Sequence, residues 1–229
     1  MLALKLGLSL NNVKTSSAGW TPNSEGSVVA WYQNDTDITF DPSTNLVSAW
    51  NDSANSYDMV QGNASEQPLK NSGVGTGITF DGINDHLQTT GQITISGAFT
   101  VGIKCHIEAF NNVLIADNTV NNEMFKITSS TNLRLKTSST EVVNLPLASG
   151  TFGDGYIVVT RDASNNMGLW HNGVDQNISA TLTGTADIDA IGVRNPKTNA
   201  FDGTMYEIAI FSSESTALTT NVNNRLATL

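Results

Sequence analysis

The sequence is poor in cysteine and in positive charge, and each shortage excludes a class of protein. The single cysteine, Cys105, excludes an internal disulfide and a cysteine-based zinc cluster. Lys and Arg number 11 against 21 Asp and Glu, which gives a net charge of −10 and offers no basic surface for phosphates. We therefore expect no nucleic acid among the partners.

Long hydrophobic runs are also lacking, and we expect no membrane insertion because a spanning helix needs roughly 20 apolar residues. The opening MLALKLGLSL has neither the basic start nor the continuous apolar core of an export signal. Instead, five leucines alternate with small or polar residues, the pattern of a β-strand with one buried face. They are Leu2, Leu4, Leu6, Leu8 and Leu10. Such a strand either closes the domain's own sheet or adds to a neighbouring subunit.

The chain is expected to divide near residue 25. The stretch after the leucines is polar and carries Gly and Pro, which is typical of a linker. Residues 1–25 are therefore predicted to be an attachment or oligomerisation arm. Residues 26–229 are predicted to form one domain, because β-sandwiches of this size are commonly undivided.

Period-two alternation recurs through this domain and predicts an all-β fold. It is clearest in AFTVGIKCHI, where five apolar side chains, from Phe99 to Ile107, face one way. Leu218, Val222 and Leu226 instead recur at helical spacing after a Ser-rich start. The prediction is an antiparallel two-sheet sandwich with a short C-terminal helix. The segment TNLVSAWNDSANS, at 44–56, is compatible with either a turn or a bent strand.

Four segments follow one another in an order that resembles a known family. They are VVAWYQNDTDITFDPSTNLVSAWNDSANSYDMVQGNASEQP, ITFDGINDHLQTTG, YIVVTRDASNNMGLWHNGVDQ and FDGTMYEIAIFSSESTALTTNVNNRLATL. Together they are similar to the laminin-G-like, concanavalin A-like jelly-roll modules of bacteriophage structural and bacterial surface proteins. The resemblance implies a jelly-roll sandwich from residue 28 to residue 229. It leaves the function open, because this sandwich carries lectins, hydrolases and structural modules.

No catalytic residue is predicted, and we expect the protein not to be an enzyme. Glucanases of this fold resemble one another in a Glu-x-Asp-x-x-Glu strand, whereas the seven glutamates here stand singly. The family counterpart of Glu207 is structural. No Gly-x-Ser-x-Gly elbow occurs, Cys105 lies on an apolar strand face, and the three histidines lack metal-type spacing.

The segment DGIND offers the strongest cofactor site that the sequence suggests. Asp81, Asn84 and Asp85 would supply the oxygen ligands that calcium prefers. The same residue types are equally typical of tight turns, in which the carboxylate bonds its own backbone. Calcium and a metal-free turn both stay open.

Sugar binding would require an exposed aromatic ring beside polar groups. Trp31 and Trp50 lie in segments that form the core of the family. Trp170 alternates with Leu169, so one of its faces is exposed or covered by a second element. Trp20 lies in the predicted linker, is the least constrained, and is the ligand-binding candidate.

Three functional hypotheses follow. The leading one is a non-enzymatic bacteriophage virion protein, a capsid decoration or tail-fibre module. If Met1 is the natural start, a surface-type domain without an export signal fits assembly in the host cytoplasm and release by lysis. Its partners would be further copies of itself, such as a trimer, other virion proteins and surface glycans. The second hypothesis is a lectin-like adhesion domain, with calcium at Asp81 to Asp85, and the third is a polysaccharide hydrolase.

Overall fold

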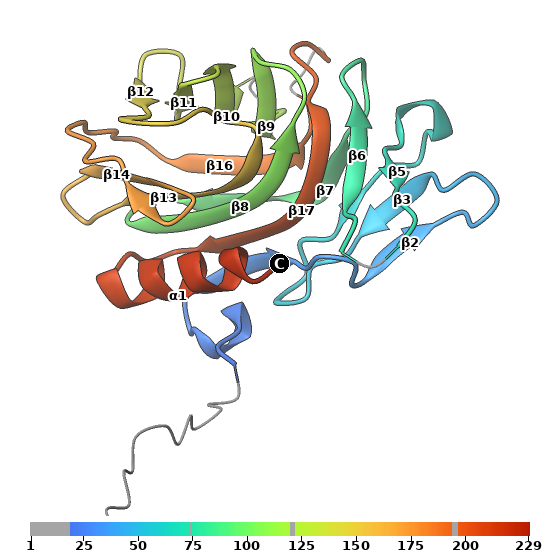
Figure 1. The fold of residues 1–229 in the computed structure, drawn as a ribbon, viewed down its shortest axis with the longest axis horizontal. Coiled ribbons are helices and arrows are strands. Elements are labelled where there is room, and N and C mark those ends of the chain that lie inside the picture. The colour runs from blue at the N-terminus through green and yellow to red at the C-terminus, as the bar shows by residue number, and fades with distance from the viewer. Residues whose placement is uncertain (1–18, 74, 120–121, 194–196) are drawn as a thin grey trace, which may run out of the picture.

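The computed structural model describes residues 19–73, 75–119, 122–193 and 197–229. They form two antiparallel β-sheets packed face to face, with one α-helix against the outer side of one sheet (Figure 1). The predicted jelly-roll sandwich with a short C-terminal helix is therefore confirmed. The five-leucine strand predicted in the arm lies outside the described residues.

Sheet A carries the helix, and β8 and β17 lie at its centre. Its strands, in spatial order, are β15 (Val174–Asp175), β14 (Met167–His171), β13 (Asp154–Arg161), β8 (Phe99–Ile107), β17 (Asp202–Phe211), β6 (Ile78–Asp81) and β5 (Leu69–Lys70). A further strand, β1 (Val28–Tyr32), pairs with the later part of β17, from Ile208 to Phe211.

Sheet B covers the opposite side of the core. Its strands, in spatial order, are β12 (Val142–Pro146), β11 (Asn132–Lys136), β10 (Asn122–Ser129), β9 (Asn112–Asp117), β16 (Ala186–Ile191), β7 (Leu87–Ile95), β4 (Met59–Val60), β3 (Val47–Trp50) and β2 (Ile38–Phe40). Two short 3-10 helices, η1 (Pro22–Ser24) and η2 (Ala64–Glu66), lie in the connections. The open segment 44–56 holds both a strand, β3, and a turn.

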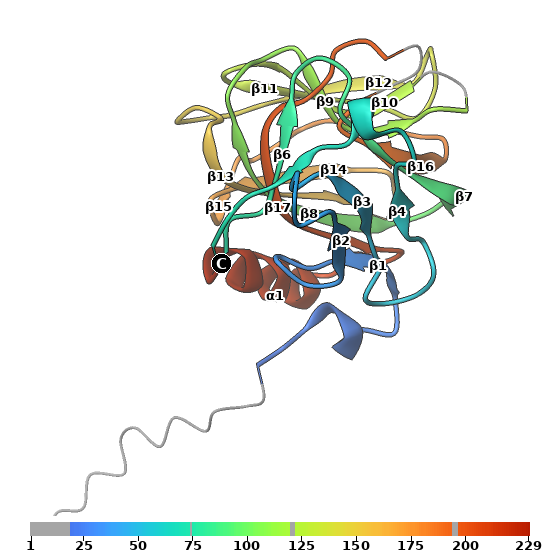
Figure 2. The same ribbon diagram turned by 90° about the vertical axis from the view of Figure 1, so that its right-hand side faces the viewer.

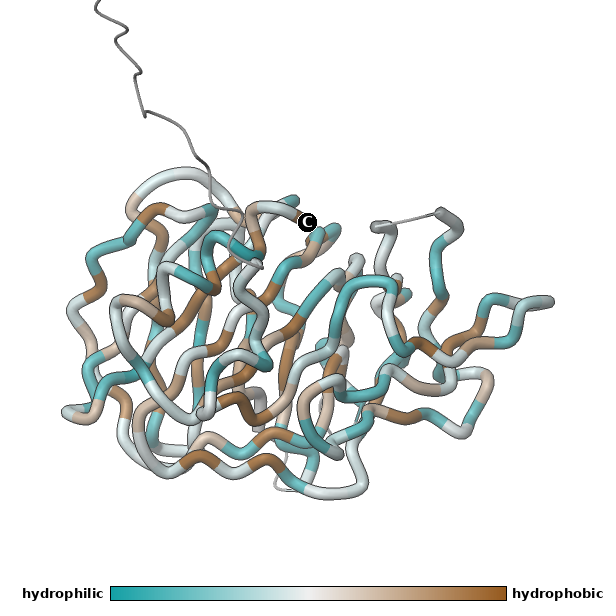
Figure 3. Tube along the Cα trace, turned by 90° about the horizontal axis from the view of Figure 1, so that it is seen from below, coloured by the Kyte–Doolittle hydropathy of each residue, from teal (hydrophilic) through white to brown (hydrophobic). Residues whose placement is uncertain are grey.

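The main core lies between the sheets. In β8, apolar side chains alternate with polar or small ones, and the apolar ones point into this core. Phe99, Val101, Ile103, Cys105 and Ile107 are all buried there, as predicted. Figure 3 shows hydrophobic positions alternating with polar ones along the strands. Burial raises the pKa of Cys105 to about 12, so this residue stays a neutral thiol in the core.

A second, smaller core lies under helix α1 (Thr216–Ala227), on the outer face of sheet A (Figure 2). Leu218, Val222 and Leu226 are buried there, at the helical spacing that the sequence predicts. The Ser215 Oγ caps the helix by accepting a hydrogen bond from the Leu218 N–H at 3.1 Å. No helix within the described ranges is long and apolar enough to cross a bilayer.

The seating of α1 on β8 depends on Gly102. A Cβ atom at this position would lie 2.5 Å from Val222 Cγ1 and 3.1 Å from Leu226 Cδ1. We expect Gly102→Ala to lower the free energy of unfolding by about 1–3 kcal/mol, because the added methyl pushes the helix away from the sheet. Chemical denaturation measures this change.

Gly91 in β7 is the matched control for this substitution. A Cβ atom there would meet nothing within 4 Å, so Gly91→Ala should leave stability unchanged or slightly raised. Equal effects of the two substitutions would contradict the close approach of α1 to β8.

Candidate binding groove

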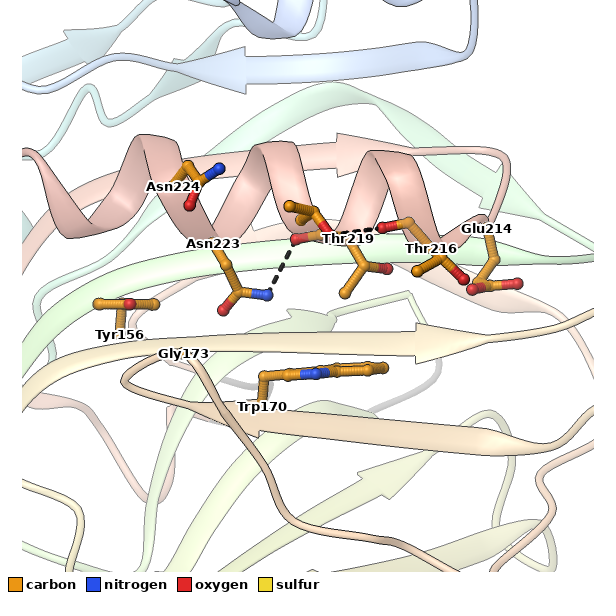
Figure 4. A pocket seen from close by; sticks show the side chains of 9 residues that line it. Tyr156, Trp170, Gly173, Glu214, Thr216, Thr219, Asn223 and Asn224 are labelled. Atoms are coloured by element: carbon orange, nitrogen blue, oxygen red, sulfur yellow. Dashed lines mark hydrogen bonds between the residues drawn. The ribbon is translucent and has the colours of Figure 1, made fainter. Parts of the chain in front are cut away.

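A groove runs between α1 and the β13–β14 hairpin on the outer face of sheet A (Figure 4). Its cavity measures about 290 Å³. Tyr156 and Trp170 line it from the hairpin, Glu214 lines it just before the helix, and Thr219 and Asn223 line it from the helix. An aromatic wall therefore faces a polar one.

The alternation of β14 presents Trp170 to this groove. Met167 and Leu169 point into the core, which directs Gly168 and Trp170 outward. A Cβ atom at Gly168 would lie 2.7 Å from Trp170 Cζ3. The indole therefore lies close to Gly168 of the same strand, and Figure 4 shows it edge-on between the ribbons of β13 and β14. It lines the groove together with Tyr156.

Two buried polar groups on α1 lack a partner. The side chain of Thr219 is in a residue only 4 % exposed, and Asn223 is 8 % exposed. Neither Thr219 Oγ1 nor Asn223 Oδ1 has a hydrogen-bond partner within the described part of the chain. The Asn223 Nδ2 donates to the Thr219 carbonyl at 2.9 Å, which fixes the amide oxygen as the free end. A buried polar atom without a partner costs about 1–3 kcal/mol, so both oxygens are candidate acceptors for a ligand.

A second cavity, of about 450 Å³, adjoins the first. Both cavities are lined by Trp170 and Glu214, so the indole contributes to both. Asp162 and Asp175 also line the second cavity. Asp162 is held by a turn, because its carboxylate accepts from the Asn166 side chain at 2.8 Å, and this hydrogen bond lowers its pKa.

Glu207 holds the helix wall of the groove in place. Its carboxylate is fully buried and receives two hydrogen bonds of 2.8 Å from the Arg225 guanidinium. The Trp31 Nε1 donates to the same carboxylate at 3.0 Å. These contacts agree with the structural role that the resemblance implies for Glu207. The hydrogen bonds that Arg225 donates to Glu207 raise the pKa of the Arg225 guanidinium.

The DGIND segment forms a tight turn between β6 and β7. The Asp81 Oδ1 accepts from the backbone N–H groups of Ile83 at 2.8 Å and Asn84 at 3.2 Å. Asp85 Oδ2 accepts from the Asp81 N–H at 3.1 Å, and Asn84 Nδ2 donates to the Ser65 carbonyl. No cluster of three or more His, Cys, Asp or Glu fit to hold a metal occurs in the described ranges. These contacts favour the turn interpretation, and calcium stays a prediction.

The raised pKa of Asp85 predicts that its ionised carboxylate destabilises the fold. Burial, and then the charge of Asp81, raise its pKa to about 7, against 3.8 in an unfolded chain. The folded protein therefore holds an extra proton between these values, and stability falls as the pH rises from about 4 to about 7. We expect Asp85→Asn to raise the free energy of unfolding by about 1–2 kcal/mol at pH 8 and by nothing at pH 4. Urea denaturation at both pH values measures the difference.

Calcium binding would reverse this result, because the ion would stabilise the ionised Asp85. Asp85→Asn would then lower stability at pH 8 in calcium, and EDTA would lower the stability of the unmodified protein. An equal effect of the substitution at both pH values would contradict the raised pKa.

Trp20, the ligand-binding candidate from the sequence, packs on the domain instead of standing free in a linker. Its Nε1 donates to Glu25 Oε1 at 2.7 Å, and its ring centroid lies 6.2 Å from that of Phe211. The sequence could not anticipate this packing, because Phe211 lies at the far end of the chain. Trp20 also lines a separate cavity of about 430 Å³ beside Arg225, so its ligand role stays a prediction.

The groove residues that lie on α1 or just before it could not be identified from the sequence. Glu214, Thr219 and Asn223 carry no motif, and only the packing of α1 on β8 and β13 brings them opposite Trp170. The glycines at 102 and 168 are the one signal that was present. Glycine within a strand marks a place where another chain segment or side chain approaches closely.

Comparisons with known proteins bear on the fold. No protein-family model matches the chain, and no curated protein matches its sequence. A Trypanosoma rangeli sialidase in complex with sialic acid matches with a TM-score of 0.57 and 10 % identity, over 89 % of this chain and 33 % of that chain. The binding domain of botulinum neurotoxin serotype D/C matches with a TM-score of 0.54 and 15 % identity, over 90 % of this chain and 53 % of that one.

This chain thus spans about a third of the sialidase chain and about half of the toxin chain. At such low identities the likeness shows the fold alone. Both comparisons agree with an antiparallel β-sandwich, and neither assigns a function to the groove.

Proposed function

We propose that this protein is a non-enzymatic carbohydrate-binding module and that the groove beside Trp170 is its binding site. The observation that carries the proposal is an aromatic ring opposite two buried, unpartnered oxygens, Thr219 Oγ1 and Asn223 Oδ1. The C–H face of a sugar stacks on an aromatic ring, while its hydroxyls donate to such oxygens. Two proteins of similar fold are compatible with a binding role, since one contains sialic acid and the other is a toxin's binding domain.

The test is binding of the full chain to an immobilised panel of glycans, with and without EDTA. We expect binding that EDTA leaves unchanged, because the polar groups of the groove need no ion. Binding that EDTA abolishes would instead favour the calcium-dependent lectin hypothesis, with the site at Asp81 to Asp85. The absence of binding to every glycan would overturn the proposal.

We retain the virion setting as a proposal about where such a module acts. It rests on the alternating leucines and on the resemblance to phage jelly-roll modules, and residues 1–18 lie outside the described part of the chain. In this setting the arm joins copies of the chain or other virion proteins, and the sandwich displays the groove outward.

Deleting residues 1–12 tests the arm. We expect the truncated protein to keep the circular dichroism and melting temperature of a folded domain, and to lose self-association, because the leucine strand supplies the contact between copies. Light scattering measures the mass in solution. A truncated protein that assembles like the full chain would count against the virion proposal and would leave the groove unaffected.

A further inference from the structure

The two cavities together are large enough for more than one sugar unit. They measure about 290 Å³ and 450 Å³, and both are lined by Trp170 and Glu214. Each volume is near the lower end of the roughly 300–1,000 Å³ found for small-ligand sites. A chain of sugar units that crosses the indole would fill both cavities, with one unit stacked on the ring.

The lining of both cavities is rich in hydrogen-bond acceptors. Thr219 Oγ1 and Asn223 Oδ1 are unpartnered, and the carboxylates of Glu214, Asp162 and Asp175 add negative charge. Within the described part of the chain, no Lys or Arg lines either cavity. Hydroxyl groups suit this surface because they donate hydrogen bonds without bringing a negative charge.

The arginines on α1 and β13 bind other groups of the protein. The guanidinium of Arg225 on α1 pairs with buried Glu207. Arg161 on β13 is fully buried, and it donates to the carbonyls of Gly97 at 2.6 Å and Gly184 at 2.7 Å. Neither side chain is available to neutralise an acidic sugar, so α1 and β13 offer no cation to offset the repulsion between such a ligand and the carboxylates.

We infer that the groove selects an uncharged oligosaccharide of at least two units, lying across Trp170, and rejects sugars that carry carboxylate or sulfate groups. The inference rests on the proposed function. It separates this chain from the sialidase of similar fold, whose structure contains the acidic sugar sialic acid.

The experiment is calorimetric titration of the full chain with cello-, chito- and galacto-oligosaccharides of one to six units, and with sialylated and sulfated counterparts of those that bind. We expect the affinity for neutral chains to rise from one unit to two or more. A single carboxylate or sulfate should weaken binding about tenfold or more, because the carboxylates that line the cavities repel its charge.

Glu214→Gln distinguishes charge from shape. Glu214→Gln should reduce the difference in affinity between neutral and acidic ligands. Glu66→Gln removes the same charge from a residue that lines neither cavity, and it should leave that difference unchanged. Equal or tighter binding of acidic sugars, or full affinity for a single unit, would overturn the inference and leave the proposed function standing. Failure of every sugar to bind would overturn both.

Discussion

Replacing Trp170 with alanine is expected to weaken glycan binding by at least about 2 kcal/mol, or roughly 30-fold in Kd. The indole is shared by both cavities, so its loss removes the stacking surface from the whole groove. Trp170 is only partly buried, and the substitution leaves the core between the sheets untouched. Isothermal titration with the tightest-binding neutral oligosaccharide measures the loss, and circular dichroism shows that the variant is folded.

Trp20→Ala is the matched control. Trp20 is also a partly buried tryptophan on the outer face of sheet A, and it contributes to the same small core under α1. It lines a different cavity, so its replacement should leave Kd within about twofold while costing similar stability. If Trp20→Ala abolished binding and Trp170→Ala did not, the ligand would lie beside Trp20, as the sequence alone suggests, and the groove proposal would fail.

The second large effect is expected at the ion pair that holds α1. Arg225→Ala should lower the free energy of unfolding by about 3 kcal/mol, because it leaves the fully buried Glu207 carboxylate without its charged partner. For a domain of this size the melting temperature should fall by roughly 6–12 °C. Arg225 also lies 5.3 Å from the centroid of the Trp31 ring, and that cation–π contact is lost with it.

A double-mutant cycle isolates the ion pair from these other contacts. In a Glu207→Gln background the buried charge is already gone, so Arg225→Ala should cost about 1 kcal/mol or less. Equal costs in both backgrounds would show that Arg225 acts through packing alone. Because the pair anchors the helix wall, we also expect Arg225→Ala to weaken glycan binding, although Arg225 does not line the groove.

The elements that the sequence predicts well are those in which a local pattern records burial. The alternation from Phe99 to Ile107 reports one buried face of β8, and the spacing of Leu218, Val222 and Leu226 reports the buried stripe of α1. The pattern understates the burial of β8, because on its outer face Gly102 lies under α1 and Thr100 is buried and donates to the Ser213 carbonyl. These are tertiary contacts, and the sequence pattern of a single strand does not predict them.

The groove could not be predicted for the same reason. Trp170 was recognised as a side chain with one face exposed or covered, but its polar partners lie more than forty positions later, on a helix whose docking site the sequence does not state. The pairing of Glu207 with Arg225 and the packing of Trp20 on Phe211 are also contacts between separate elements. The Asp81 turn, by contrast, is local, and both of its interpretations could be drawn from five residues.

The most direct test of the account is a two-dimensional ¹⁵N NMR titration of the indole N–H signals with a neutral oligosaccharide. The chain contains four tryptophans, so four indole signals are expected, and single Trp→Phe variants assign them. The account predicts that the Trp170 signal shifts in proportion to the bound fraction while that of Trp50, fully buried between the sheets, stays in place. Saturable binding that leaves the Trp170 signal unmoved would contradict it.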